Sequence, residues 1–217
     1  MTGHPASLCD LASTEQPIVF IIDDDATVRE ALRRLLRSAG LEVKVVNSAS
    51  EFLQSELPDV ASCLILDIRR LSGLDFQVDL AAAGIHIPII VITGHGDIPM
   101  SVRAMKAGAI DFLTKPFRDQ DILDAVTTAI ERDRRSRNDA KALSGLQALF
   151  ATLSPREQEV MALVVTGRMN KQIAAEIGVV EITVKMHRGR IMRKMAAKSL
   201  ADLVRMAEAL GIGSAAS

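Results

Sequence analysis

Short apolar runs alternate with segments of helical spacing throughout the first half of this 217-residue chain. The apolar runs cover residues 18–22, 41–46, 63–66, 87–92 and 109–113. The helical spacing appears over residues 26–39, 49–57, 73–83 and 99–107, and again from residue 119 onward. Such alternation predicts repeated βα units, whose strands form a parallel sheet with helices on both faces. We therefore expect a doubly wound α/β domain with a five-stranded sheet in the order 2-1-3-4-5.

From residue 153 onward, every periodic segment has helical spacing. Ser154 can cap a helix that starts at Pro155, and Glu157 would complete a capping box. Further helices are predicted over residues 171–177, 181–195 and 199–210. Only a short turn containing Gly178 separates the first two of these, which is typical of a helix-turn-helix over residues 170–195. A plain four-helix core is the alternative interpretation.

The connector between the two halves supports two interpretations. A charged stretch over residues 131–141 follows the helical spacing and precedes a second apolar series. The connector is either a helix with a solvated linker or one long helix used for dimerisation, although Gly145 interrupts a clean heptad. The predicted division is a flexible tail over 1–16, an α/β domain over 17–132, a helical linker over 133–150, a helical domain over 151–212 and a tail over 213–217.

The charges of the two halves differ. Residues 1–118 carry a net charge of −4 and residues 152–217 a net charge of +4, which indicates two domains with different partners. No apolar run approaches the ~20 residues of a membrane span, and the first 16 residues lack the pattern of a secretory signal. The two cysteines, Cys9 and Cys63, fit a reducing compartment. We therefore expect a cytoplasmic protein with no membrane partner.

Five polar side chains lie where predicted strands end. Asp23 and Asp24 follow the first strand, Asp67 ends the third, and Thr93 and Lys115 follow the fourth and fifth. Open parallel sheets bind their ligands at this edge. Converging carboxylates repel one another unless a cation joins them, and an oxygen-only ligand set favours Mg²⁺. With a hydroxyl and an ammonium beside it, Asp67 has the groups that acyl-phosphate chemistry needs.

Residues 17–130 resemble the receiver domain of two-component response regulators. The similarity is carried by Ile21-Ile22-Asp23-Asp24-Asp25, Leu66-Asp67-Ile68-Arg69, Ile92-Thr93-Gly94-His95-Gly96-Asp97 and Phe112-Leu113-Thr114-Lys115-Pro116-Phe117. Each motif is weak alone, but the four together, in order and at these spacings, are highly specific. Residues 93–100 and 104–109 are most similar to FixJ/StyR-like members.

The resemblance implies that Asp67 accepts a phosphoryl group from a sensor histidine kinase. It implies that Asp24, Asp67 and the carbonyl of Arg69 bind Mg²⁺, with Asp23 acting through water. Thr93 and Phe112 would form the conformational switch, and the peptide bond from Lys115 to Pro116 would be cis. Apart from its own phosphorylation and dephosphorylation, the chain would not be an enzyme.

The loop after Asp67 departs from the family pattern. Gly73 follows Asp67 by six positions rather than the usual eight, and the proline expected soon after Arg69 is missing. The shorter loop is either a harmless variant or a cause of altered Mg²⁺ binding or phosphoryl lifetime. The second possibility would leave a phosphorylation-independent regulator with a degenerate receiver as an alternative function.

The stretch from Asp23 to Thr27 also fits the nucleophile motif of haloacid-dehalogenase-type phosphatases. Asp23 would then be the nucleophile and Asp25 the acid/base. This interpretation leaves Asp67 without a role and needs a further acidic pair on a strand after Lys115. The chain becomes helical there, so we expect the receiver instead.

Residues 153–210 resemble the LuxR/NarL-type helix-turn-helix. The similarity is carried by residues 153–160, by Gly167-Arg168-Met169-Asn170-Lys171 and by Thr183-Val184-Lys185-Met186-His187-Arg188. The resemblance implies double-stranded DNA as the partner, with the helix over 181–195 in the major groove. The predicted DNA contacts are Lys171, Lys185, Met186, Arg188, Arg190 and Lys194, with Ser199 as a further phosphate contact.

By the same resemblance, Gly189 occupies a base-facing position without a side chain. The chain has no Trp or Tyr, which argues against binding single strands by stacking. Together, the sequence predicts a transcription regulator whose phosphorylation favours a homodimer and promoter binding.

Overall fold

The computed structural model describes residues 16–67, 76, 79–80, 82–94 and 98–213 of the chain. The chain forms two compact units, one ending at Arg137 and the other starting at Asn138. Across the described residues, none of the helices combines the length and the apolar character that crossing a membrane would need.

The first unit is built on a five-stranded parallel sheet with the order β2-β1-β3-β4-β5. The strands are β1 (Ile18–Ile22), β2 (Glu42–Val45), β3 (Ser62–Asp67), β4 (Ile89–Thr93) and β5 (Asp111–Thr114). Every residue of β1, β3 and β4 is buried, as expected for strands with helices on both faces. The predicted doubly wound fold and its strand order are confirmed.

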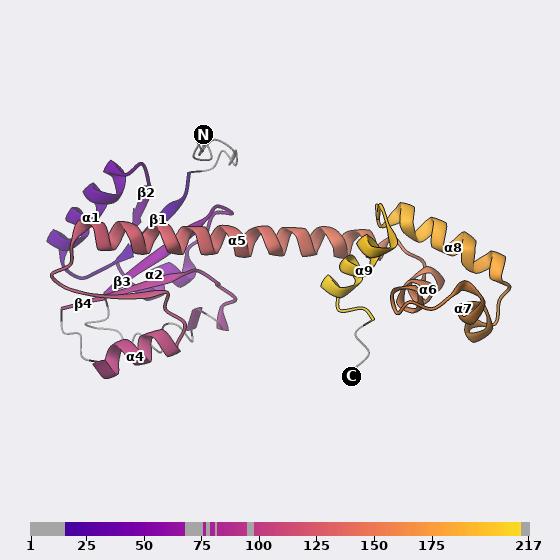
Figure 1. Cartoon of the computed structure of the whole chain (residues 1–217). Helices are drawn as coiled ribbons and strands as arrows, with labels where there is room; N and C mark the ends of the chain where they lie inside the picture. The colour runs from indigo at the N-terminus through magenta and orange to yellow at the C-terminus, as the bar shows by residue number, and fades with distance from the viewer. Residues whose placement is uncertain (1–15, 68–75, 77–78, 81, 95–97, 214–217) are drawn as a thin grey trace, which may run out of the picture. The chain divides into compact units, whose positions relative to one another are not determined.

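Helices cover both faces of this sheet (Figure 1). The helices are α1 (Ala26–Ser38) and α5 (Asp119–Ala151) on one face, and α2 (Ala49–Gln54) and α4 (Ile98–Lys106) on the other. Successive residues of a strand point to opposite faces, so Phe20 packs edge-on against Phe52 of α2 while Ile21 packs with Leu32 of α1. The helix predicted over 73–83 falls largely outside the described residues.

Strand β5 starts two residues later than the sequence predicts. The backbone N–H of Ala109 still donates to the carbonyl of Ala104, so Ala109 belongs to the turn that closes α4. Gly108 has a φ of +99°, which an L side chain rarely adopts. The tight turn after α4 therefore delays the strand to Asp111.

Helix α5 continues for 33 residues, so the charged stretch and Gly145 lie inside one helix rather than in a separate linker. Its Asp133 is buried and accepts hydrogen bonds from the backbone N–H of Ser62 at 2.9 Å and from Nε of Arg137 at 2.6 Å. Arg137 also pairs with Asp59 at 3.0 Å. We call these four residues the Asp133 cluster, and it joins α5 to the start of β3.

The second unit packs four helices around one apolar core after the end of α5 (Figure 1). They are α6 (Pro155–Val165), α7 (Asn170–Ile177), α8 (Glu181–Lys194) and α9 (Leu200–Ala209). Ser154 and Glu157 form the predicted capping box at the start of α6. Gly178 ends α7 with a φ of +67°, and α8 begins three residues later. The short α7–α8 connection confirms the predicted helix-turn-helix arrangement.

Candidate functional sites

The carboxyl edge of the sheet brings together the acidic residues that the sequence predicts. Strands β1 and β3 pair in parallel, with Ile22 beside Leu66, so the next residues, Asp23 and Asp67, are neighbours. Nζ of Lys115 lies 2.7 Å from Oδ2 of Asp23 and 2.6 Å from Oδ2 of Asp67. We call Asp23, Asp24, Asp67 and Lys115 the acidic pocket.

The ion pairs of the acidic pocket are shielded from water. The side chains of Asp23 and Asp67 are 0% and 2% exposed, and that of Lys115 is 12% exposed. Burial alone would lower the pKa of Lys115, but its hydrogen bonds to the two carboxylates outweigh burial and raise that pKa. Lys115 therefore stays an ammonium, which a carboxylate needs beside it if it is to receive an anionic group.

The acidic pocket also has the donor set of a hard divalent cation. Carboxylate oxygens of Asp23, Asp24 and Asp67 lie within 4.8 Å of one another, and Asp24 is exposed while the other two are buried. Oxygen-only ligands of this kind suit Mg²⁺ or Ca²⁺. The fourth predicted ligand, the carbonyl of Arg69, lies outside the described residues, as does the short loop around it.

The two predicted switch residues lie on neighbouring strands. Thr93 ends β4 and is 2% exposed, and its carbonyl accepts a hydrogen bond of 2.7 Å from the backbone N–H of Lys115. Phe112 on β5 is partly buried and packs against the sheet face that α4 covers. The peptide bond from Lys115 to Pro116 is cis, as the resemblance implies. Thr93 and Lys115 thus lie at adjacent strand ends and are joined by a backbone hydrogen bond.

The carboxylate of Asp25 caps helix α1 in this structure. Its Oδ1 accepts hydrogen bonds from the backbone N–H groups of Thr27 and Val28, which cap α1 and lower the pKa of Asp25. Between β5 and residue 213, the described elements are all helices, so the strand with a further acidic pair is missing there. Neither observation favours the phosphatase interpretation of Asp23 and Asp25.

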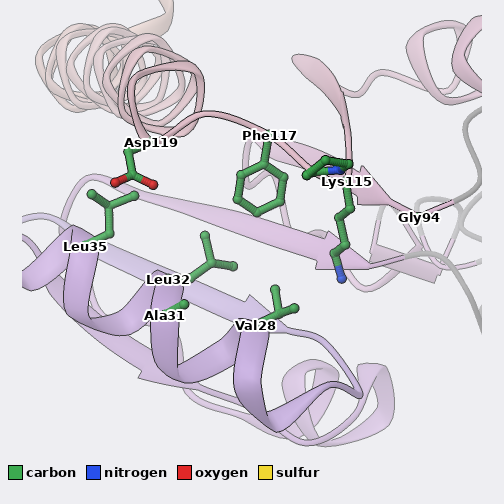
Figure 2. Close-up of a pocket in the computed structure, with 9 residues that line it drawn as sticks. Val28, Ala31, Leu32, Leu35, Gly94, Lys115, Phe117 and Asp119 are labelled. Atoms are coloured by element: carbon green, nitrogen blue, oxygen red, sulfur yellow. The ribbon is translucent and has the colours of Figure 1, made fainter.

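A cavity of about 500 Å³ lies beside the acidic pocket, between α1 and the loop from β5 to α5. Val28, Leu32 and Phe117 line it, and Lys115 forms part of its wall (Figure 2). Figure 2 shows the Lys115 side chain extending from its loop toward α1. The acidic pocket is therefore bordered by an apolar surface on this side.

The predicted DNA contacts fall into two groups. Lys171 on α7 and Lys185, Met186 and Arg190 on α8 are exposed. The remaining three have partners within the unit. Arg188 donates to Oδ1 of Asn170 at 2.9 Å, Lys194 donates to Glu157 at 2.6 Å and to the carbonyl of Thr152 at 2.9 Å, and the hydroxyl of Ser199 caps α9.

Two features of the sites were not predicted from the sequence. Ile182 on α8 is 61% exposed, although its apolar side chain suggested no surface role. Its offset of two residues from the buried Val184 already placed it off the core-facing side of a helix, so the helical spacing contained that signal. Asp133 had no comparable signal, since its backbone partner Ser62 lies 71 positions away in the chain.

Two family models match the chain. Residues 19–127 match the response regulator receiver domain, and residues 151–207 match the bacterial regulatory proteins of the luxR family. Together these matches cover both compact units.

Full-length relatives match over nearly the same extent. Nodulation protein W of Bradyrhizobium diazoefficiens is 63% identical over 203 residues, covering 93% of this chain and 89% of the relative. The transcriptional regulatory protein FixJ of Rhizobium meliloti is 44% identical, covering 90% of this chain and 97% of the relative. The solved structure of the response regulator StyR matches with a TM-score of 0.79 and 49% identity, covering 89% of this chain and 99% of StyR.

Proposed function

The chain belongs to the two-component response regulators that combine a receiver domain with a LuxR-type DNA-binding domain, and we propose that phosphorylation of Asp67 controls its binding to promoter DNA. The main support is the double contact of Lys115, whose Nζ lies within 2.7 Å of both Asp23 and Asp67. This contact holds Asp67 at the end of a buried strand, next to the positive charge of Lys115 and the carboxylate oxygens of Asp23 and Asp24. A sensor histidine kinase is the proposed phosphodonor.

In the proposed reaction, a carboxylate oxygen of Asp67 attacks the phosphorus atom of a phosphohistidine on the kinase. An O–P bond forms as the P–N bond breaks, and the histidine nitrogen leaves with the bonding electron pair. Lys115 can donate a charge-assisted hydrogen bond to a phosphoryl oxygen, because its Nζ already lies 2.6 Å from Asp67. The hydroxyl of Thr93, at the end of the adjacent strand, is the proposed second donor.

Mg²⁺ is the proposed cofactor of this transfer. The oxygens of Asp23, Asp24 and Asp67 suit a hard cation, with Arg69 a further predicted ligand through its carbonyl. When bound, Mg²⁺ would neutralise charge on the phosphoryl oxygens. Asp23 and Asp24 would hold the ion from the end of β1, which leaves Asp67 free to present its second oxygen to the phosphodonor.

The proposed response starts from the added charge. A phosphoryl group brings about −1.5 to −2 charges to Asp67, toward which Thr93 and Lys115 would move. Phe112 would then turn inward, and the surface formed by α4 and β5 would change to favour a homodimer. A dimer would place two copies of α8 about one DNA turn, ~34 Å, apart. A coupling of ~1–3 kcal/mol is enough for a 5–150-fold change in DNA affinity.

The proposal is tested by incubating the full-length protein with acetyl phosphate and Mg²⁺. Intact mass should show one added phosphoryl group on the wild type and none on Asp67→Asn. The matched control, Asp79→Asn, removes an exposed carboxylate of the same unit and should be phosphorylated like the wild type. Phosphorylation should also increase molecular mass in light scattering and affinity for promoter DNA.

The outcomes separate the candidate functions. Normal phosphorylation of Asp67→Asn would show that Asp67 is not the acceptor. A wild type that gains no phosphoryl group yet binds DNA would instead be the phosphorylation-independent regulator. We place this activity in the cytoplasm, because the LuxR-type domain needs access to DNA.

A further inference from the structure

Helix α8 carries apolar residues on the side that faces away from its own core. Val184 and Ile191 are buried in the core of the second unit, whereas Ile182 is 61% exposed and Met186 is 52% exposed. Residues four and three positions apart share one helix face, so Ile182, Met186 and Gly189 form one outward row. We call this row the apolar stripe.

Gly189 has no role that the fold explains. Its φ is not positive, and no described atom outside its immediate surroundings lies within 4 Å of the position that a Cβ would occupy. Glycine weakens an exposed helix relative to alanine, because it loses more backbone freedom on folding. A remaining use for a glycine at such a place is to let another molecule approach the backbone closely.

The charges around the apolar stripe indicate what approaches it. Lys185 and Arg190 flank the stripe and are exposed, and α8 holds five basic residues against one acidic residue, Glu181. A second copy of the same surface would bring like charges together, which is unfavourable. Duplex DNA instead offers phosphates to the flanking cations and base edges to the stripe between them.

Resting on the proposed DNA binding, we propose that the apolar stripe recognises thymine methyl groups in the major groove and that Gly189 allows α8 to approach the bases closely. Ile182 and Met186 have no strong hydrogen-bonding group with which to read bases. The apolar feature on the major-groove edges is the C5-methyl group of thymine. The preferred site should therefore contain A·T pairs opposite the first two turns of α8.

The test uses the full-length protein, and its first step selects binding sites from a random pool of duplex DNA. Each thymine of the selected site is then replaced by deoxyuridine, which lacks only the methyl group. For the wild type, at least one replacement should weaken binding about fourfold, the effect of one buried methyl-sized group. Ile182→Ala or Met186→Ala should bind the thymine site about as weakly and should no longer respond to that replacement.

Gly189→Ala tests the close approach separately. It should raise the melting temperature of the protein by about 2–6 °C and yet weaken binding to the selected site by at least tenfold. The matched control is Gly145→Ala, another glycine inside a helix with open space where its Cβ would lie. This control should raise the melting temperature in the same way and leave DNA affinity unchanged.

Each contrary outcome is decisive. If no duplex is selected, the proposed DNA binding fails and the inference fails with it. If a duplex is selected but deoxyuridine has no effect, or weakens the wild type and the alanine variants equally, methyl recognition is wrong while DNA binding stands. If Gly189→Ala binds as tightly as the wild type, the close approach is wrong. If the stripe variants change only the oligomer mass, the occupant is a second copy of the chain.

Discussion

Two lysine ammonium groups, one in each unit, contact carboxylates at nearly the same distances but in different surroundings. Lys115 bonds to Asp23 and Asp67 at 2.7 and 2.6 Å, and Lys194 bonds to Glu157 at 2.6 Å. In the acidic pocket one ammonium faces three carboxylates, so negative charge remains for a cation to neutralise. The Glu157–Lys194 pair is balanced. The Lys115 side chain is 12% exposed and that of Lys194 is 39% exposed. Excess charge and deeper burial, rather than distance, distinguish the site that can take up ligands.

The second pair has further hydrogen-bond partners within the chain. Glu157 accepts from the backbone N–H of Ser154, and Lys194 donates to the carbonyl of Thr152. These bonds join the start of α6 to the end of α8. The pair therefore holds the end of α8 against the start of α6, so Lys194, a predicted DNA contact, also has partners within its own unit.

The largest effect should follow from removing the ammonium group of Lys115 from the acidic pocket. Lys115→Ala should slow phosphorylation of Asp67 by acetyl phosphate about 10²–10³-fold, the usual loss for a donor that stabilises developing charge. The initial rate of phosphoryl gain, followed by intact mass, measures it. Lys194→Ala is the control and should be phosphorylated at the wild-type rate. If Lys115→Ala and Lys194→Ala were phosphorylated at the same rate, Lys115 would have no special role in the reaction of Asp67.

The second pair should matter for stability instead. Glu157→Ala should lower the free energy of unfolding by about 2–4 kcal/mol, because it removes a buried carboxylate that completes the capping box and accepts a charge-assisted hydrogen bond from Lys194. Urea denaturation followed by far-UV circular dichroism measures the change. Glu159→Ala removes an exposed acid on the same helix and should change stability by about 0.5 kcal/mol or less. A similar small change in Glu157→Ala would mean that the pair contributes little.

The sequence predicts the acidic pocket because its residues occupy strand ends, and strand ends follow from local periodicity. Asp67, Thr93 and Lys115 could be placed together once the strand order was inferred. The contact of Lys194 with Glu157 could not be predicted, because it joins residues 37 positions apart. Such contacts depend on how helices pack, and a basic residue on a recognition helix has the same sequence signature whether it contacts DNA or a neighbouring helix.

The Asp133 cluster tests whether a buried acid outside the acidic pocket is purely structural. Asp133→Asn should destabilise the first unit by about 1–3 kcal/mol, since the neutral amide weakens the bonds to Ser62 and Arg137. Phosphorylation of Asp67 should keep its wild-type rate. Asp139→Asn, an exposed acid farther along α5, is the control for both measurements. Loss of phosphorylation in a folded Asp133→Asn protein would show that the cluster also supports the acidic pocket.

A further effect is the acid dependence that Glu157 contributes. Hydrogen bonds from Lys194 and from the backbone of Ser154 lower the pKa of Glu157 from 4.5 to about 2. The unfolded chain therefore binds a proton more readily than the folded chain, so this contribution to stability is present above pH 4.5 and is lost as the pH falls toward 2. The stability difference between wild type and Glu157→Gln, measured by urea denaturation of the full chain, should shrink over that interval. Both proteins share the carboxylates of the acidic pocket, so the difference in unfolding free energy between them isolates Glu157. A difference that stays constant from pH 4.5 to 2 would mean that the charge of Glu157 does not stabilise the fold.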